Sequence, residues 1–245
     1  MLERAATGIG VSSVIGDEGI VRCYPLIFLS NGTYFPRFEL EILRVLEGRS
    51  TVAVAANPAG VESVMLSPQK RLATDWRGCL WPRFPARNPI PRISIRQLLE
   101  DPATGARLKD RVVILGSTAT GLSYVWFTPL GVGHELLWTA WAFEAMSKGY
   151  VLNRPNTSNT VEAFLTLVAA LLAAVLVGVL RGRWPLVAGI AAAAAALGVS
   201  AWAFLGYGFL FDGFVPALAA LVMSAITPVL WRFSTKPAAN SDAAG

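Results

Sequence analysis

Three uncharged apolar stretches in the last third of the chain constrain its fold more than any other feature. They cover residues 163–180, 185–205 and 214–231, and only short polar breaks separate them. About 20 apolar residues in a helix, rising 1.5 Å each, cross the roughly 30 Å hydrocarbon core of a bilayer. The pattern therefore predicts three transmembrane α-helices, with the lipid bilayer as a partner of this chain.

The rest of the sequence divides around this membrane segment. Most charged residues, 30 of 37, lie in the first 155 positions, which are enough to enclose a hydrophobic core. We therefore expect a water-exposed domain over 1–155, a membrane domain over 156–231 and a short tail over 232–245.

Charges next to the apolar stretches predict the orientation. Arg181 and Arg183 separate the first two stretches and Lys236 follows the third, whereas the remaining break contains Asp212 and no basic residue. Because basic residues near span ends prefer the cytoplasm, the tail is predicted to be cytoplasmic and the N-terminal domain to lie outside. A domain outside needs a signal peptide or an upstream span, and the opening MLERAATGIG has neither pattern. Either the domain is cytoplasmic or the sequence lacks its true beginning, and the charge pattern favours the second alternative. We therefore expect the true beginning of the protein to be missing here.

Runs of strand type alternate with runs of helical spacing in the N-terminal domain. The strand-type runs are 20–29, 51–56 and 111–115, and the helical runs are 38–46, 95–99 and 136–148. Ser30–Thr33 is typical of a hairpin turn, the proline-rich segment 76–91 is expected to be irregular, and 111–115 (RVVIL) indicates a buried strand. This alternation predicts a mixed α/β domain.

Four motifs occur in order along this domain. They are Asp17–Arg22 followed by Pro25-Leu26, then Tyr34-Phe35-Pro36 ahead of a helix, then Leu108–Gly116 followed by Ser117–Gly121, and finally Thr128-Pro129. In combination with three closely spaced spans, they resemble type 2 CHASE domains, the extracellular sensor domains of bacterial signalling receptors. The resemblance implies an α/β extracytoplasmic sensor domain anchored in the bacterial cytoplasmic membrane.

The sequence departs from that family at both ends. Family members normally begin with a transmembrane helix and a first strand ending in acidic residues, and nothing here corresponds to them. Family members also continue into a cyclase, a kinase or another output domain, whereas this sequence stops at Gly245. The resemblance therefore implies a sensor truncated at both ends, whose signal passes to a separate cytoplasmic output protein, a kinase or cyclase. Small residues over 189–201 allow close helix packing, either within one subunit or in a homodimer.

The glycine-containing loop after the 111–115 run is the candidate ligand-binding site. It imitates a phosphate-binding loop, but Leu122 stands after Gly121 where a P-loop requires lysine, so an NTPase site is excluded. Such a loop either presents backbone N–H groups to an anion or is a plain strand-to-loop turn. The residues predicted to face a ligand are Gly116, Ser117, Thr118, Thr120, Gly121 and Thr128.

No pattern in the sequence predicts catalysis, a metal site or a cofactor. His134 is the only histidine and is expected at a turn or helix start, and a Gly-x-Ser-x-Gly elbow is absent. The net charge is +5, but the arginines are scattered, which argues against nucleic-acid binding. Cys23 and Cys79 either form a disulfide or remain free thiols, and the sequence leaves both alternatives open.

Two other classes of protein compete with a non-enzymatic sensor. A membrane assembly protein whose N-terminal domain binds a protein partner is the main alternative. A transporter subunit is disfavoured, because no span carries an ionisable residue in its middle.

Overall fold

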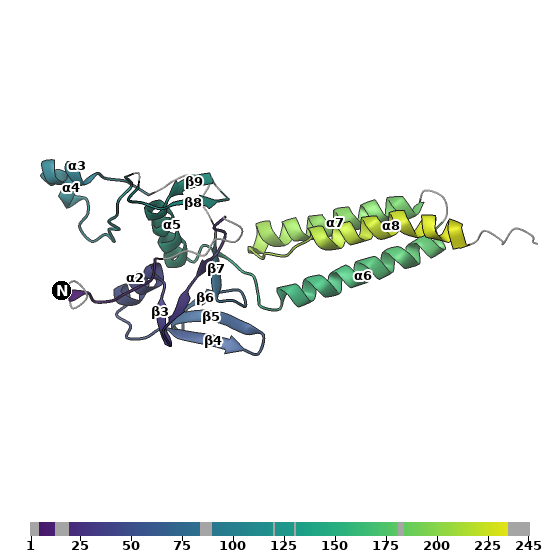
Figure 1. Cartoon of the computed structure of the whole chain (residues 1–245), viewed down its shortest axis with the longest axis horizontal. Helices are drawn as coiled ribbons and strands as arrows, with labels where there is room; N and C mark the ends of the chain where they lie inside the picture. Colours follow the sequence, from purple (N-terminus) through teal and green to yellow (C-terminus); the bar gives the residue numbers. More distant parts are fainter. Residues whose placement is uncertain are drawn as a thin grey trace, which may run out of the picture. The chain divides into compact units, whose positions relative to one another are not determined.

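The structure is a computed structural model that describes residues 5–12, 20–83, 90–119, 121–129, 131–180 and 184–234. It divides into two compact units, Met1–Asn156 and Thr157–Gly245. Figure 1 shows short strands and helices in the first unit and long helices in the second. The first three residues of the Asp17–Arg22 motif, Thr120, the Arg181–Arg183 loop and the tail beyond Ser234 lie outside the described residues.

The N-terminal unit is mixed α/β, as predicted. Its strands are β1 (Tyr24–Pro25), β2 (Ile27–Ser30), β3 (Thr33–Pro36), β4 (Ala53–Asn57), β5 (Gly60–Ser67), β6 (Lys70–Ala73), β7 (Cys79–Pro82), β8 (Val125–Thr128), β9 (Gly131–His134) and β10 (Val151–Leu152). Its helices are α2 (Phe38–Leu46), α3 (Ile95–Glu100), α4 (Pro102–Ala106) and α5 (Glu135–Lys148). The helical runs predicted from spacing are therefore confirmed.

Local sequence accounts for the β2–β3 hairpin. Asn31 and Gly32 join the two strands with φ of 49° and 77°, and a type I′ turn needs positive φ at both positions. This confirms the predicted turn. The single strand predicted over 20–29 is wrong, because Leu26 turns inward and its N–H donates to the carbonyl of Gly78, which separates β1 from β2.

Small antiparallel sheets surround one hydrophobic core. Strands β4, β5 and β6 form one sheet in that order, and β7 pairs with both β1 and β10. Helix α5 packs against α2. The core residues are Val21, Tyr24, Leu26, Leu40, Leu43, Val64, Leu66, Leu72, Leu80, Ala142 and Met146. The segment 76–91, predicted to be irregular, supplies the central strand β7, since its prolines lie at and beyond the strand end.

The strand predicted at 111–115 is wrong. Val112, Val113 and Leu115 are 42, 53 and 75% exposed and adopt no regular structure. No described strand runs along this segment, and no backbone hydrogen bond is formed by Val112–Gly116 within the described part of the chain. A strand needs a neighbouring strand to pair with, and the described structure supplies none.

The C-terminal unit consists of α6 (Ser158–Val179), α7 (Trp184–Tyr207) and α8 (Phe214–Ser234), which cover the three predicted spans. Two of them, Ser158–Leu176 of α6 and the whole of α7, are long and apolar enough to cross a bilayer. The apolar part of α8 among the residues searched, Phe214–Ile226, is shorter. Many large apolar side chains on all three helices are exposed, which fits lipid contact better than a water-facing surface.

Close backbone approach holds these helices together. Helix α8 packs against both α6 and α7, and Gly189 of α7 lies directly against Ser224 of α8. The connection before α8 is fixed by hydrogen bonds, because Ser200 Oγ donates to the Phe211 carbonyl at 2.6 Å and the Asp212 N–H donates to Glu162 Oε1 at 2.9 Å.

Gly189→Ala is expected to destabilise the helical unit by about 1–3 kcal/mol, because the new Cβ overlaps the Ser224 side chain. Gly198→Ala on the same helix is the matched control, since nothing lies within 4 Å of the Cβ it adds. There the higher helix propensity of alanine should leave stability unchanged or raised. Thermal unfolding of both variants in detergent measures the difference, and equal stability would contradict the packing.

Candidate functional site

A buried charge cluster at the start of α2 is the most unusual chemical feature of the N-terminal unit. Arg37 is 0% exposed and Glu39 is 1% exposed, and Arg37 Nε lies 2.8 Å from Glu39 Oε2. The Arg37 guanidinium also stacks over the ring of buried Tyr24, 4.5 Å from its centroid. Charged side chains are almost never this buried unless they are paired, so the fold is built around this contact.

Backbone pairing on both sides fixes Arg37. It is the N-cap residue of α2 with extended geometry, and its N–H donates to the Leu26 carbonyl while its carbonyl accepts from Glu41 N–H. Val11, from an earlier segment of the chain, forms a parallel β-bridge with Arg37, and the Phe38 N–H donates to the Val11 carbonyl. The side chain is thus directed into the core by the strand that precedes the helix.

The cluster is electrostatically strained. Burial raises the pKa of Glu39, and the Arg37 charge only partly offsets that effect. Burial likewise raises the pKa of Tyr24, against the charge of Arg37. Within the described residues, Glu39 Oε1 and the Tyr24 hydroxyl have no hydrogen-bond partner. Buried polar groups are normally satisfied, so this cluster is a place where protonation or movement changes the energy of the fold.

Glu135 connects the cluster to the start of α5. Partial burial raises its pKa, while the charge of Arg37 and a hydrogen bond from the Ser12 side chain act in the opposite direction. Two carboxyl groups, Glu39 and Glu135, therefore interact with a single buried guanidinium.

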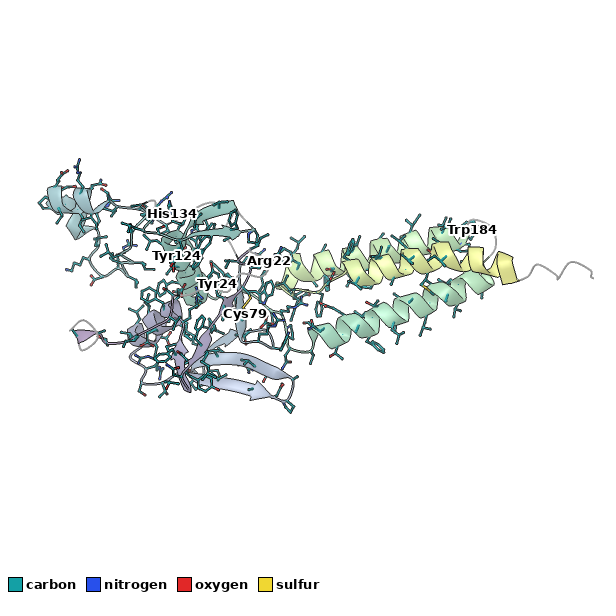
Figure 2. All side chains as sticks on the ribbon, viewed as in Figure 1. Arg22, Tyr24, Cys79, Tyr124, His134 and Trp184 are labelled. Atoms are coloured by element: carbon teal, nitrogen blue, oxygen red, sulfur yellow. A yellow bond between two sulfur atoms is a disulfide. The ribbon has the colours of Figure 1, made fainter. Side chains whose placement is uncertain are left out.

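The predicted ligand loop is held against the same end of α5. Gly116 lies against Leu136, the Glu135 N–H donates to the Tyr124 carbonyl at 3.0 Å, and Ser123 Oγ is hydrogen-bonded to His134 Nδ1 at 2.8 Å. His134 is the N-cap residue of α5, so the predicted helix-start position is confirmed. Figure 2 labels Tyr24, Tyr124 and His134, which come from β1, the residue before β8 and the end of β9.

The six residues predicted to face a ligand take different positions. Gly116, Ser117 and Thr118 lie in an exposed irregular segment, where Ser117 Oγ accepts from Ala119 N–H. Gly121 has a positive φ of 84°. Thr128 is buried at the end of β8, and its hydroxyl donates to the Gly131 carbonyl. Thr120 lies outside the described residues. A ligand role for these residues stays a prediction.

Cys23 and Cys79 form a disulfide, which resolves the open alternative. The bond closes a loop of 56 residues in sequence separation, a constraint of roughly 4 kcal/mol on the unfolded chain. Asp75 lies beside it, with its carboxylate accepting from Cys79 N–H, Arg77 N–H and Trp81 Nε1–H. The ligand atoms of Cys23, Asp75 and Cys79 lie within 4.8 Å of one another, but disulfide sulfurs are not thiolates, the form that binds metals.

Sequence reasoning missed Arg37, Glu39 and Tyr24. Charged residues at the start of a helix are normally exposed to solvent. The one sequence signal for burial is that Arg37 lies directly after a strand and before an apolar helix. The Arg37 guanidinium stacks on the ring of Tyr24, which is distant in sequence, so the residues around Arg37 could not identify this partner.

These observations define an α/β domain that is followed in sequence by apolar helices. The domain contains a buried charge cluster, and its described residues form no catalytic constellation. The CHASE2 domain matches residues 2–207. The chain therefore belongs to the CHASE2 domain family, a family of extracellular sensory domains. The comparisons find no matching curated protein and no matching solved structure.

Arg37→Met is expected to lower the free energy of unfolding by about 3–5 kcal/mol, because it leaves Glu39 buried without its partner. The matched control is Arg71→Met, which breaks an ion pair with Glu62 that is half exposed and should cost at most about 1 kcal/mol. Denaturant unfolding followed by tryptophan fluorescence compares them. Equal decreases in unfolding free energy for the two variants would show that the buried ion pair contributes no more to stability than the exposed one.

The free energy of unfolding of Glu39→Gln is expected to rise relative to that of wild type as the pH increases from about 4 to 7. Glu39 has a raised pKa in the folded state, so its contribution is fully present below the unfolded value near 4.3 and is lost as it ionises. Glutamine cannot ionise, so the difference in unfolding free energy between this variant and wild type should grow over this range. Glu62→Gln is the exposed control. A difference that shrinks with rising pH would mean that the attraction of Arg37 outweighs burial.

Proposed function

We propose that this chain is the signal-input part of a bacterial membrane receptor, with the N-terminal unit outside the cytoplasmic membrane and the C-terminal tail inside. The observation that carries this proposal is the CHASE2 match, which extends through the α/β unit and includes α6 and α7. The disulfide supports an extracytoplasmic location, because disulfides persist in oxidising compartments and are rare in the cytosol.

We further propose that α8 crosses the bilayer together with α6 and α7, which makes the chain a three-span protein. The exposed side chains along the described part of α8 are apolar: Phe214, Val215, Leu218, Leu221, Val222 and Ile226. A helix that exposes this much apolar surface is suited to lipid. Three spans also place Asp212 outside and the basic Arg181/Arg183 loop inside, in line with the positive-inside rule.

The connectivity of β7 supports a route for the signal. Strand β7 pairs with β1, which carries Tyr24 of the charge cluster, and also with β10, the last strand before α6. In the proposed mechanism, a ligand at the 116–128 loop acts on the start of α5, and the change passes through Glu135, Arg37 and the β1–β7–β10 sheet toward α6. The expected cytoplasmic partner is an output protein of the kinase or cyclase class.

Cysteine labelling in intact spheroplasts tests the orientation. Single cysteines are placed at Ser30, which is exposed in the hairpin, and at Ala239 in the tail, and the native cysteines stay blocked as a disulfide. A membrane-impermeant maleimide should label Ser30→Cys and not Ala239→Cys. After permeabilisation, both positions should react, which controls for accessibility.

The opposite pattern, with only Ala239→Cys labelled before permeabilisation, would place the N-terminal unit in the cytoplasm. An extracytoplasmic sensor would then be ruled out. Labelling of both positions before permeabilisation would place both ends on the same side, which requires an even number of spans and contradicts α8 as the third span.

A further inference from the structure

One guanidinium and two carboxyl groups share the interior between α2 and α5. Glu39 is buried in the first turn of α2, Glu135 is half-buried at the start of α5, and the charge of Arg37 acts on both. Helix α5 packs against α2, so the two carboxyl groups approach the same cation from different elements (Figure 1). With both carboxyl groups ionised, this cluster carries one negative charge in excess, and one bound proton balances it.

The other ionisable groups nearby are either paired elsewhere or neutral. Glu41 also lies on α2, but its two carboxylate oxygens accept from Arg44, at 2.6 and 2.8 Å. His134, the N-cap residue of α5, is hydrogen-bonded through Nδ1 to a serine hydroxyl. On β1, burial raises the pKa of Tyr24, whose hydroxyl therefore stays protonated at neutral pH. Strand β7, which also packs against α5, contributes no ionisable side chain, because Cys79 is in the disulfide.

The interior of the cluster favours uptake of that proton. Glu39 Oε1 and the Tyr24 hydroxyl are buried without a hydrogen-bond partner among the described residues, so no donor stabilises a second negative charge there. Burial raises the pKa of both Glu39 and Glu135, and the charge of Arg37 offsets this effect only in part. Because the two carboxyl groups also act on each other, the proton belongs to the pair, and it binds above the ordinary glutamate value of about pH 4.3.

Protonation changes the forces on the start of α5. The Glu135 carboxylate is attracted to Arg37, and a negative charge in the first turn of a helix is also favoured by the helix dipole. Both contributions are lost when the carboxyl group is neutral. The Glu135 N–H donates to the Tyr124 carbonyl at 3.0 Å, so a shift of this turn also moves the residue that precedes β8.

We propose that Arg37, Glu39 and Glu135 form a pH-sensitive switch, in which the carboxyl pair takes up one proton from solvent beside Glu135 and the contact between the start of α5 and α2 weakens. The proposed function supplies the stimulus, a fall in extracytoplasmic pH, and in that respect the proposal rests on it. The switch itself is a property of the N-terminal unit.

Tryptophan fluorescence of the full chain in detergent, titrated from about pH 8 to pH 4, tests the proposal. Trp138 and Trp141 report on α5, because both are buried on it with ring centroids 4.5 Å apart. The native chain should show a one-proton transition with its midpoint above about pH 4.3. Glu39→Gln and Glu135→Gln each leave one carboxylate for Arg37, so each variant should fold and move the midpoint down by about one unit or more.

Glu144→Gln is the matched control, because Glu144 lies on the same helix and is paired with Lys148 outside the cluster. Its midpoint should equal that of the native chain. Absence of a transition in the native chain, or a midpoint that neither Glu39→Gln nor Glu135→Gln moves, would overturn the proposal. So would a transition that His134→Asn removes, since the histidine would then be the titrating group.

Hydrogen–deuterium exchange of the native chain, corrected for the intrinsic effect of pH, gives a second readout that needs no variant. Peptides from the start of α5 should lose protection below the midpoint, while peptides from β4–β6 keep theirs. Loss of protection throughout the unit would indicate acid unfolding and overturn the switch. A failed titration leaves the sensory role intact, whereas reversed labelling at Ser30 and Ala239 removes that role and leaves the switch.

Discussion

The fold of the N-terminal unit depends on how Arg37 is buried. A guanidinium that is removed from water must find its charge partner and its stacking surface in the interior, and here Glu39 and Tyr24 supply them. The backbone of Arg37 is bonded to Leu26 and Glu41, so the position of the charge also fixes where α2 begins and how β1 lies beneath it. Packing of α2 against α5 then brings the first turn of α5 within the field of the same charge.

Strand β7 organises the other side of this unit. It pairs with β1 and β10, is cross-linked to Cys23 through the disulfide, and is preceded by a turn in which Asp75 accepts three N–H donors. These contacts reinforce one another because each restrains the same few residues. Strand β10 pairs with β7 on the edge opposite β1.

The parts of the fold that were predicted correctly are those specified by neighbouring residues. The Asn31-Gly32 turn, the helical spacing of α2 and α5 and the apolar lengths of α6 and α7 can all be read within a short window. The parts that were missed depend on residues distant in sequence. The burial of Arg37 depends on Tyr24, which is distant in sequence, and the choice between a Cys23–Cys79 disulfide and free thiols depends on a spatial approach across 56 residues. The 111–115 run has the composition of a strand, but a strand also needs a neighbouring strand, and composition does not show whether one is present.

This unpaired run is also the part of the N-terminal unit whose conformation can change with the smallest loss of contacts. Residues 112–116 form no backbone hydrogen bond in the described structure, so ordering or releasing them breaks few contacts, whereas the backbone of Arg37 is hydrogen-bonded to Leu26 and Glu41. Both regions contact the first turn of α5, where Gly116 lies against Leu136 and the charge of Arg37 acts on Glu135. In the proposed mechanism, a ligand that orders this segment acts first on α5, and through α5 on the interaction of Glu39 and Glu135 with Arg37. A buried charge cluster with unsatisfied polar groups is suited to couple the ordering of one loop to a shift of the β1–β7–β10 sheet.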